Sequence, residues 1–217
     1  MKKYIVLFVL FFLPIVAYLF FASGVHNFVN LPTVTASIPD LGEWKDQEGN
    51  NFSLDDKITV IGFPGTEILY NKGDAFNLNQ KIYDKVREFK DFQLIMIVPK
   101  GTETQTQEVI EQLGAISDLS KWHYVFATPE EIKTYYEHLN LVGQLDQNLR
   151  TPNVFIIDKK RNLRGRKGNN LKGEPEYKEG YNTISAADLH NQMSDDMKII
   201  LAEYRLALKK NSADRIK

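Results

Sequence analysis

The stretch ITVIGFPG, at residues 58–65, is an apolar run that closes with proline and glycine. A strand buried on both faces of a sheet carries such a run, whereas a strand exposed on one face alternates apolar and polar residues. A second run, FQLIMIV at 92–98, is followed by Pro99-Lys100-Gly101. The two runs therefore predict a sheet that is covered by helices on both faces.

Strand and helix patterns alternate on both sides of these runs. The expected strands are residues 58–63, 92–98, 122–127, 153–158 and 163–168. The expected helices are residues 74–89, 104–114 and 129–138. The last of these helices begins Thr128-Pro129-Glu130-Glu131, with proline and acids in its first turn. The order βαβαβαββ predicts an α/β fold with a mainly parallel central sheet and a closing β-hairpin.

The C-terminal part predicts a loop and then a helix. Residues 169–182 are rich in Asn, Gly, Lys and Glu and are typical of a loop. Ser185 and Asp188 resemble a capping box, and apolar residues recur at helical spacing after them. We expect four parts: an anchor at 1–22, a tether at 23–42, a folded domain at 43–182, and a C-terminal helix and tail at 183–217.

The N-terminus predicts one transmembrane helix. Residues 4–22 carry no charge, and a helix of that length spans about 29 Å, close to the thickness of the bilayer core. Lys2 and Lys3 precede this segment and no basic residue follows before Lys45, so the N-terminus stays cytoplasmic and the domain is exported. A signal peptide cleaved near Ala22-Ser23-Gly24, leaving a secreted domain, is the alternative. No arginine-rich presequence is present, which favours a bacterial inner membrane and a periplasmic domain.

Composition excludes several kinds of chemistry. The 217 residues contain no cysteine, which excludes thiolate catalysis, disulfide exchange and cysteine-ligated metal sites. The net charge is −1, without the basic excess of a nucleic-acid-binding protein. No two histidines stand four residues apart, and adjacent carboxylates on a helix diverge by about 100°. We therefore expect no catalytic residue, metal or cofactor; a cysteine-independent enzyme using Glu67, Tyr70 and Lys72 is an alternative.

Several features resemble the thioredoxin-like superfamily. They are a strand ending in Gly62-Phe63-Pro64-Gly65, a helix after it, the pair Thr151-Pro152 before the strand at 153–158, and the closing hairpin. Together with the anchor, this layout is most similar to the Sco-type copper chaperone and thiol-disulfide branch. The resemblance covers about residues 40–168 and implies a cis peptide bond before Pro152, beside the redox site.

The same resemblance implies that the functional site is degenerate. Sco-type proteins carry a Cys-x-x-x-Cys pair after the first core strand and a histidine before the end of the fourth. The matching positions here are Ile68, Lys72 and Arg150, so no copper ligand remains. Lys72 and Arg150 would instead make the mouth of the site electropositive, where an anion could bind near Asp74; the alternative is that both are solvated surface charges.

A basic hairpin is the most conspicuous charge feature. Residues 159–172 contain seven basic side chains and no acid. We expect a docking surface for an acidic partner or anionic lipid head groups, formed by Lys159, Lys160, Arg161, Arg164, Arg166 and Lys167. The alternative is that these charges protect an exposed edge strand from pairing with other chains.

These features favour a binding or assembly module over the other classes of function. Its expected partners are the membrane, through the N-terminal helix, and a protein of unknown identity, with no nucleic acid. The Sco-type resemblance implies a link to the assembly of a respiratory complex. A structural envelope protein without a defined ligand is the further alternative.

Overall fold

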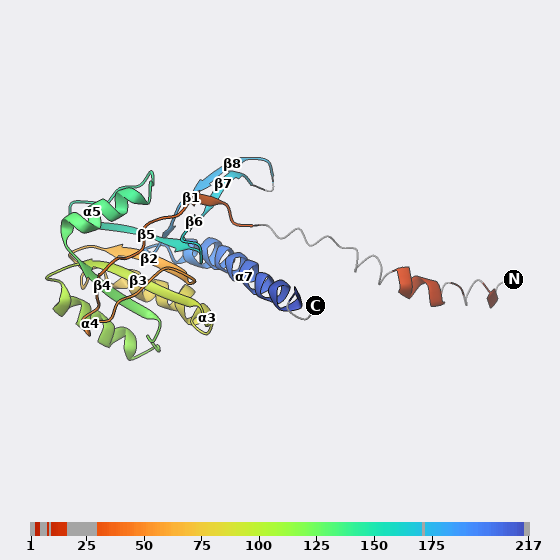
Figure 1. Ribbon diagram of the computed structural model, residues 1–217, viewed down its shortest axis with the longest axis horizontal. Coiled ribbons are helices and arrows are strands. Elements are labelled where there is room, and N and C mark those ends of the chain that lie inside the picture. The colour runs from red at the N-terminus through yellow and green to blue at the C-terminus, as the bar shows by residue number, and fades with distance from the viewer. Residues whose placement is uncertain (1–2, 5–7, 9, 17–29, 171, 215–217) are drawn as a thin grey trace.

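The computed structural model describes residues 3–4, 8, 10–16, 30–170 and 172–214 (Figure 1). Within these ranges, no helix is both long and apolar enough to cross a membrane. Residues 10–16 are helical. The predicted anchor at 1–22 falls only partly within the described ranges, because residues 1–2, 5–7, 9 and 17–22 lie outside them.

The core of the fold is a seven-stranded sheet in the order β1-β6-β5-β2-β3-β4, with β9 paired to β5. Its strands are β1 (Thr33–Thr35), β2 (Ile58–Pro64), β3 (Phe92–Pro99), β4 (Trp122–Ala127), β5 (Arg150–Ile157), β6 (Leu163–Arg164) and β9 (Tyr181–Asn182). Strands β2, β3 and β4 are parallel, and the other pairings of this sheet are antiparallel. The expected α/β class is confirmed, but the sheet is mixed rather than mainly parallel.

The direction of β5 explains why the sheet is mixed rather than mainly parallel. Pro64, at the end of β2, pairs with Arg150, at the start of β5. The loop at 139–149 therefore returns the chain to the edge where β2 ends, and β5 runs back antiparallel to β2. An apolar run predicts a buried strand but not the end from which the chain enters it.

Helices cover both faces of the sheet, as the two apolar runs predict. The helical segments are α2 (Lys72–Leu78), η1 (Asn79–Tyr83), α3 (Asp84–Val86), α4 (Glu103–Gly114), α5 (Pro129–His138), α6 (Ala186–Asp188), η2 (Leu189–Met193) and α7 (Ser194–Asp214). One apolar core packs α4, α7 and the helices between β2 and β3 on one face, and a second packs α5 on the other. Figure 1 shows α4 and α5 on opposite sides of the sheet.

The prediction of a tether at 23–42 is wrong for the part that the structure describes. Leu31, Ile38 and Leu41 are buried, each with 3% or less of its surface exposed. Strand β1 pairs with β6, which removes the free edge that β6 would otherwise present. Residues 23–29 of the predicted tether lie outside the described ranges.

Residues 163–182 also differ from prediction. The predicted strand at 163–168 divides at Gly165, where a side chain would lie 2.3 Å from the Lys178 carbonyl oxygen. Strand β7 (Arg166–Asn169) then pairs with β8 (Pro175–Lys178) as a separate two-stranded sheet. The predicted loop at 169–182 is therefore largely a hairpin, whose polar strands lack the apolar alternation that would have marked them.

Candidate functional site

The candidate site begins at a tight turn after β2. Gly65 has a φ of +75°, a conformation that glycine adopts at little cost. A Cβ atom at this position would lie 2.4 Å from the Asn148 carbonyl oxygen, which also accepts a 3.0 Å hydrogen bond from the Thr66 N–H. The turn therefore packs directly on the loop that leads into β5.

The loop after this turn is held by α4. The amide of Gln105 donates to the Thr66 carbonyl at 3.3 Å and accepts from the Leu69 N–H at 3.4 Å. Ile68 points into the apolar core and is 3% exposed. Lys72 is exposed and donates a 3.0 Å hydrogen bond to Gln112. The first position matched to the family's cysteine pair is thus part of the core, and the second lies at the surface.

Arg150 does not leave a free positive charge at the site. Its guanidinium forms a 2.6 Å ion pair with Asp74 of α2, and both side chains are less than one quarter exposed. The predicted electropositive mouth is therefore wrong for Arg150, because Asp74 compensates its charge. Ile68, Lys72 and Arg150 together supply no soft ligand, so they do not fit copper(I).

The peptide bond before Pro152 is trans, because the described residues contain no cis peptide bond. The expectation of a cis proline is wrong here. The extended chain lets Arg150 and Thr151 pair with the end of β2, across an irregularity in register between Gly62 and Phe63. The Pro152 carbonyl accepts hydrogen bonds from the Thr183 N–H at 2.9 Å and the Thr183 hydroxyl at 2.7 Å.

A small cavity remains beneath these elements. Its volume is about 30 Å³, similar to the share of one water molecule in the liquid. Met96, Val109 and Val154 contribute apolar walls, and burial raises the pKa of the Tyr124 hydroxyl, which also lines the cavity. A cavity of this size has room for about one water molecule.

The side chains proposed for a cysteine-independent enzyme are not assembled into a site. Tyr70 is 87% exposed and Glu67 is also exposed. Neither side chain forms a hydrogen bond with another described residue, while Lys72 is directed to Gln112. The described part of the chain therefore gives no observation in favour of this alternative.

Arg164, in the basic hairpin, is buried rather than presented to a partner. Its guanidinium pairs with Asp158 at 2.8 Å and with Glu203 of α7 at 3.0 Å, and it donates to the Leu31 carbonyl at 2.8 Å through Nε. The Arg164 side chain is 10% exposed and that of Asp158 is 1% exposed. Arg164 therefore joins the N-terminal segment, β6 and α7 from inside the protein.

Other cations of the hairpin are also paired internally. Arg166 pairs with Asp196 of α7 at 2.8 Å and with Glu176 at 3.0 Å, and the hydrogen bond to Asp196 raises the pKa of Arg166. Lys159 pairs with Asp91, and Arg161 pairs with Asp55 at 3.0 Å. The predicted docking surface is therefore wrong for Lys159, Arg164 and Arg166, because acids of the same chain compensate their charges. The Arg161–Asp55 pair is more exposed, at 33% and 63%, so docking through Arg161 stays a prediction. Docking through the exposed Lys160 and Lys167 stays a prediction.

Comparison with known proteins identifies the fold. The sequence matches no protein-family model and no curated protein. Among solved structures, it is similar to BsSco, a member of the Sco family of cytochrome c oxidase assembly proteins. The TM-score is 0.55 at 10% sequence identity, and the match covers 79% of this chain and 98% of that one.

Two thiol-disulfide proteins match with lower structural similarity, and no conclusion about this chain is drawn from them. The thioredoxin domain of a thiol-disulfide oxidoreductase from Bacteroides vulgatus is 16% identical, with a TM-score of 0.48, and covers 79% of this chain and 99% of that one. A putative thiol:disulfide interchange protein DsbE from Chlorobium tepidum is 14% identical, with a TM-score of 0.43. That match covers 62% of this chain and 83% of that one.

The thioredoxin-like, Sco-like fold is thus confirmed, and the chain is cysteine-free. Thiol–disulfide chemistry is excluded by composition alone, because no other side chain can carry it out. At the two positions that the resemblance matches to the cysteine pair, Ile68 belongs to the core and Lys72 lies at the surface.

Proposed function

We propose that this chain is a redox-inactive, thioredoxin-like binding or assembly module on the exported face of a bacterial inner membrane. The observation that carries this proposal is the state of the former redox site. Ile68 is buried in the core and Arg150 is paired with Asp74, yet the scaffold around them is intact. A fold that keeps its architecture but not its reactive groups is suited to binding.

The N-terminal sequence supports the proposed location. Residues 4–22 are uncharged and follow two lysines, which matches the positive-inside rule for an anchor with a cytoplasmic N-terminus. If a signal peptidase removed this segment, the domain would be secreted but would still act outside the cytoplasm.

The similarity to a Sco-family protein supports a narrower form of the proposal. The family of that structure is described as cytochrome c oxidase assembly proteins. We extend this to a role of the present chain in assembling a respiratory complex, through protein contacts rather than through copper delivery.

The location can be tested with a single introduced thiol, because the chain contains no other. Lys160 is exposed, so the Lys160→Cys variant should react with a membrane-impermeant maleimide in intact spheroplasts. A second variant, Lys2→Cys, is the matched control and should react only after detergent is added. Labelling of Lys2→Cys but not of Lys160→Cys in intact spheroplasts would refute the proposed orientation.

The binding function can be tested by crosslinking the tagged full chain in native membranes. We expect one protein partner to co-isolate in a fixed ratio, both with the wild type and with the Glu67→Gln/Tyr70→Phe variant. Turnover of a substrate that this double variant abolishes would favour the enzyme alternative instead. One-to-one binding of copper(I) by the purified chain would contradict the proposed loss of the metal site.

A further inference from the structure

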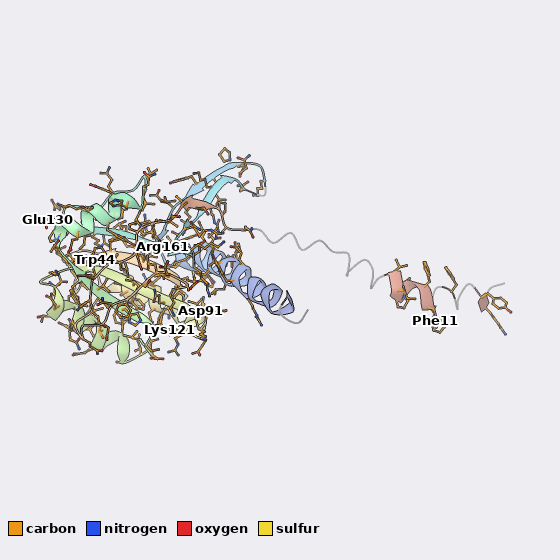
Figure 2. The ribbon with its side chains drawn as sticks, in the orientation of Figure 1. Phe11, Trp44, Asp91, Lys121, Glu130 and Arg161 are labelled. Carbon is orange, nitrogen blue, oxygen red and sulfur yellow. The ribbon has the colours of Figure 1, made fainter. Side chains whose placement is uncertain are left out.

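A large groove lies apart from the former redox site. It runs between residues 39–47 and helix α5, and its volume is about 1040 Å³. Figure 2 shows Trp44 and Glu130, which both line it, at the same end of the domain. Ligand pockets usually have volumes of about 300–1,000 Å³, so this groove has room for several side chains.

The floor of the groove is aromatic and fixed in place. The Trp44 ring meets the Tyr135 ring edge to face, with centroids 5.2 Å apart. The Tyr135 hydroxyl donates a 3.1 Å hydrogen bond to the carbonyl of Pro39, which also lines the groove. Gln47 donates a 2.7 Å hydrogen bond to the Glu103 carbonyl and ties the segment to the start of α4. The floor is therefore preorganised, which lowers the entropic cost of binding.

The rim of the groove is acidic. Six carboxylates line it, against two lysines, Lys45 and Lys100, so that the net formal charge is −4 with His138 neutral. The six are Asp40, Glu43, Asp46, Glu103, Glu130 and Glu131. Among the residues that the structure describes, none of the six forms an ion pair, unlike the acids that hold Arg150, Arg164 and Arg166.

We propose that this groove binds an extended, lysine- and arginine-rich segment of a protein partner. Among the described residues, Glu43 and Glu130 have neither an ion-pair nor a hydrogen-bond partner, whereas the other four carboxylates accept hydrogen bonds within the chain and keep their negative charge. These charges attract the cationic ends of such side chains, and opposite charge also speeds association. The partly exposed Trp44 ring, held in place by the buried Tyr135, suits the same side chains, because aromatic rings attract cations and their surface covers the aliphatic stems. The inference rests on the proposed binding function and supplies it with a surface and a partner chemistry.

The inference is tested with a defined probe and the full chain in a non-ionic detergent. The probe is a fluorescein-labelled ten-residue peptide that alternates lysine and valine, and the matched probe replaces each lysine with glutamate. At 150 mM salt the Debye length is about 8 Å, so distant charges contribute little. We expect saturable anisotropy changes with the lysine peptide and none with the glutamate peptide.

Two double variants decide whether the groove itself binds the peptide. Glu43 and Glu130 are exposed, and their side chains hydrogen-bond to no described residue, so Glu43→Lys/Glu130→Lys should leave the fold intact. This variant should bind the lysine peptide at least tenfold more weakly. The matched control Glu67→Lys/Glu108→Lys changes the net charge equally outside the groove and should bind within twofold of the wild type.

Tryptophan fluorescence gives a second readout. The chain contains two tryptophans, and Trp122 is 5% exposed, so peptide in the groove should alter the emission of Trp44. The change should be absent in Trp44→Phe. Equal weakening by both double variants, or no binding of the lysine peptide by the wild type, would overturn the inference.

The same variants separate this inference from the proposed function. If Glu43→Lys/Glu130→Lys still co-isolates the wild-type partner from native membranes in full yield, the groove is the wrong surface but the binding function stands. If the wild type co-isolates no partner in a fixed ratio, the binding function itself is refuted. If the groove variant loses a partner that the control variant retains, and that partner crosslinks through a basic segment, both proposals are supported.

Discussion

Replacing Arg164 with methionine should destabilise the domain strongly. The guanidinium bridges Asp158, Glu203 and the Leu31 carbonyl, with contacts of 2.8, 3.0 and 2.8 Å. Methionine would leave the Asp158 carboxylate, which is 1% exposed, without its cationic partner. Removing one partner of a buried ion pair costs about 3–5 kcal/mol, because the other charge stays buried without compensation.

That loss is large relative to the stability of a typical domain, which is about 5–15 kcal/mol. For a chain of this size, 1 kcal/mol lowers the melting temperature by about 2–4 °C, so Arg164→Met should lower it by about 6–20 °C. Thermal and urea unfolding of the full chain, followed by circular dichroism at neutral pH, measures both quantities. Lys167→Met removes the same charge from an exposed position nearby and should change stability by less than about 0.5 kcal/mol.

If Arg164→Met lowers the free energy of unfolding no more than Lys167→Met does, Arg164 does not form a buried ion pair. Arg164 would then behave as a free surface cation, and it would again be available to the predicted docking surface. A double-mutant cycle with Glu203→Gln gives an independent check, since residues in one network should show a non-additive coupling of about 0.5–3 kcal/mol. Strict additivity would show that Arg164 does not hold α7 to the domain.

Three further results are expected from unfolding measurements. Ile68→Ala should cost about 2–5 kcal/mol, as truncation of a core residue does; an unchanged stability would place this position outside the core. Gly65→Ala should cost about 1–3 kcal/mol, because φ is +75° and the new Cβ would meet the Asn148 carbonyl; a neutral effect would contradict the turn geometry. Burial opposes ionisation of Asp158, but hydrogen bonds from the Asn162 N–H and from Arg164 outweigh it and hold the pKa of Asp158 below its ordinary value of 3.8. As pH falls, the unfolded state therefore binds this proton first, so the stabilisation is complete above about pH 4 and is lost below it. Relative to the wild type, Asp158→Asn should lose stability less steeply between pH 4 and pH 2; an identical slope would exclude Asp158 as a source of acid sensitivity.

The central strands could be predicted because their signal is local. The runs at 58–63, 92–98 and 122–127 correspond to β2, β3 and β4 to within one residue at each end. Helix α5 begins where Thr128 caps the Glu131 N–H and Glu131 in turn accepts from the Thr128 N–H. Apolar runs and capping residues act over a few positions, so they can be recognised without knowledge of the fold.

The segments that sequence reasoning missed are polar or short. Strand β8 alternates exposed and half-buried residues, β7 is exposed after Arg166, and β1 has three residues. Strands β7 and β8 are stabilised by pairing with each other, whereas β1 pairs with β6, which lies about 130 residues further along the chain. Leu31, for example, is buried against residues of the C-terminal helix, and its N–H donates to Glu203 at 2.9 Å.

At the candidate site, too, some properties follow from the sequence and others depend on distant segments. The absence of cysteine determined from the outset that thiols play no part in what this chain does, and the apolar runs determined that a sheet buried on both faces forms. Whether Arg150 and Arg164 face a partner or the protein's own carboxylates was decided only by the tertiary structure. Asp74 is 76 residues from Arg150, and Glu203 is 39 from Arg164. A charge is a property of one residue, but its compensation depends on which distant segments folding brings within a few ångströms.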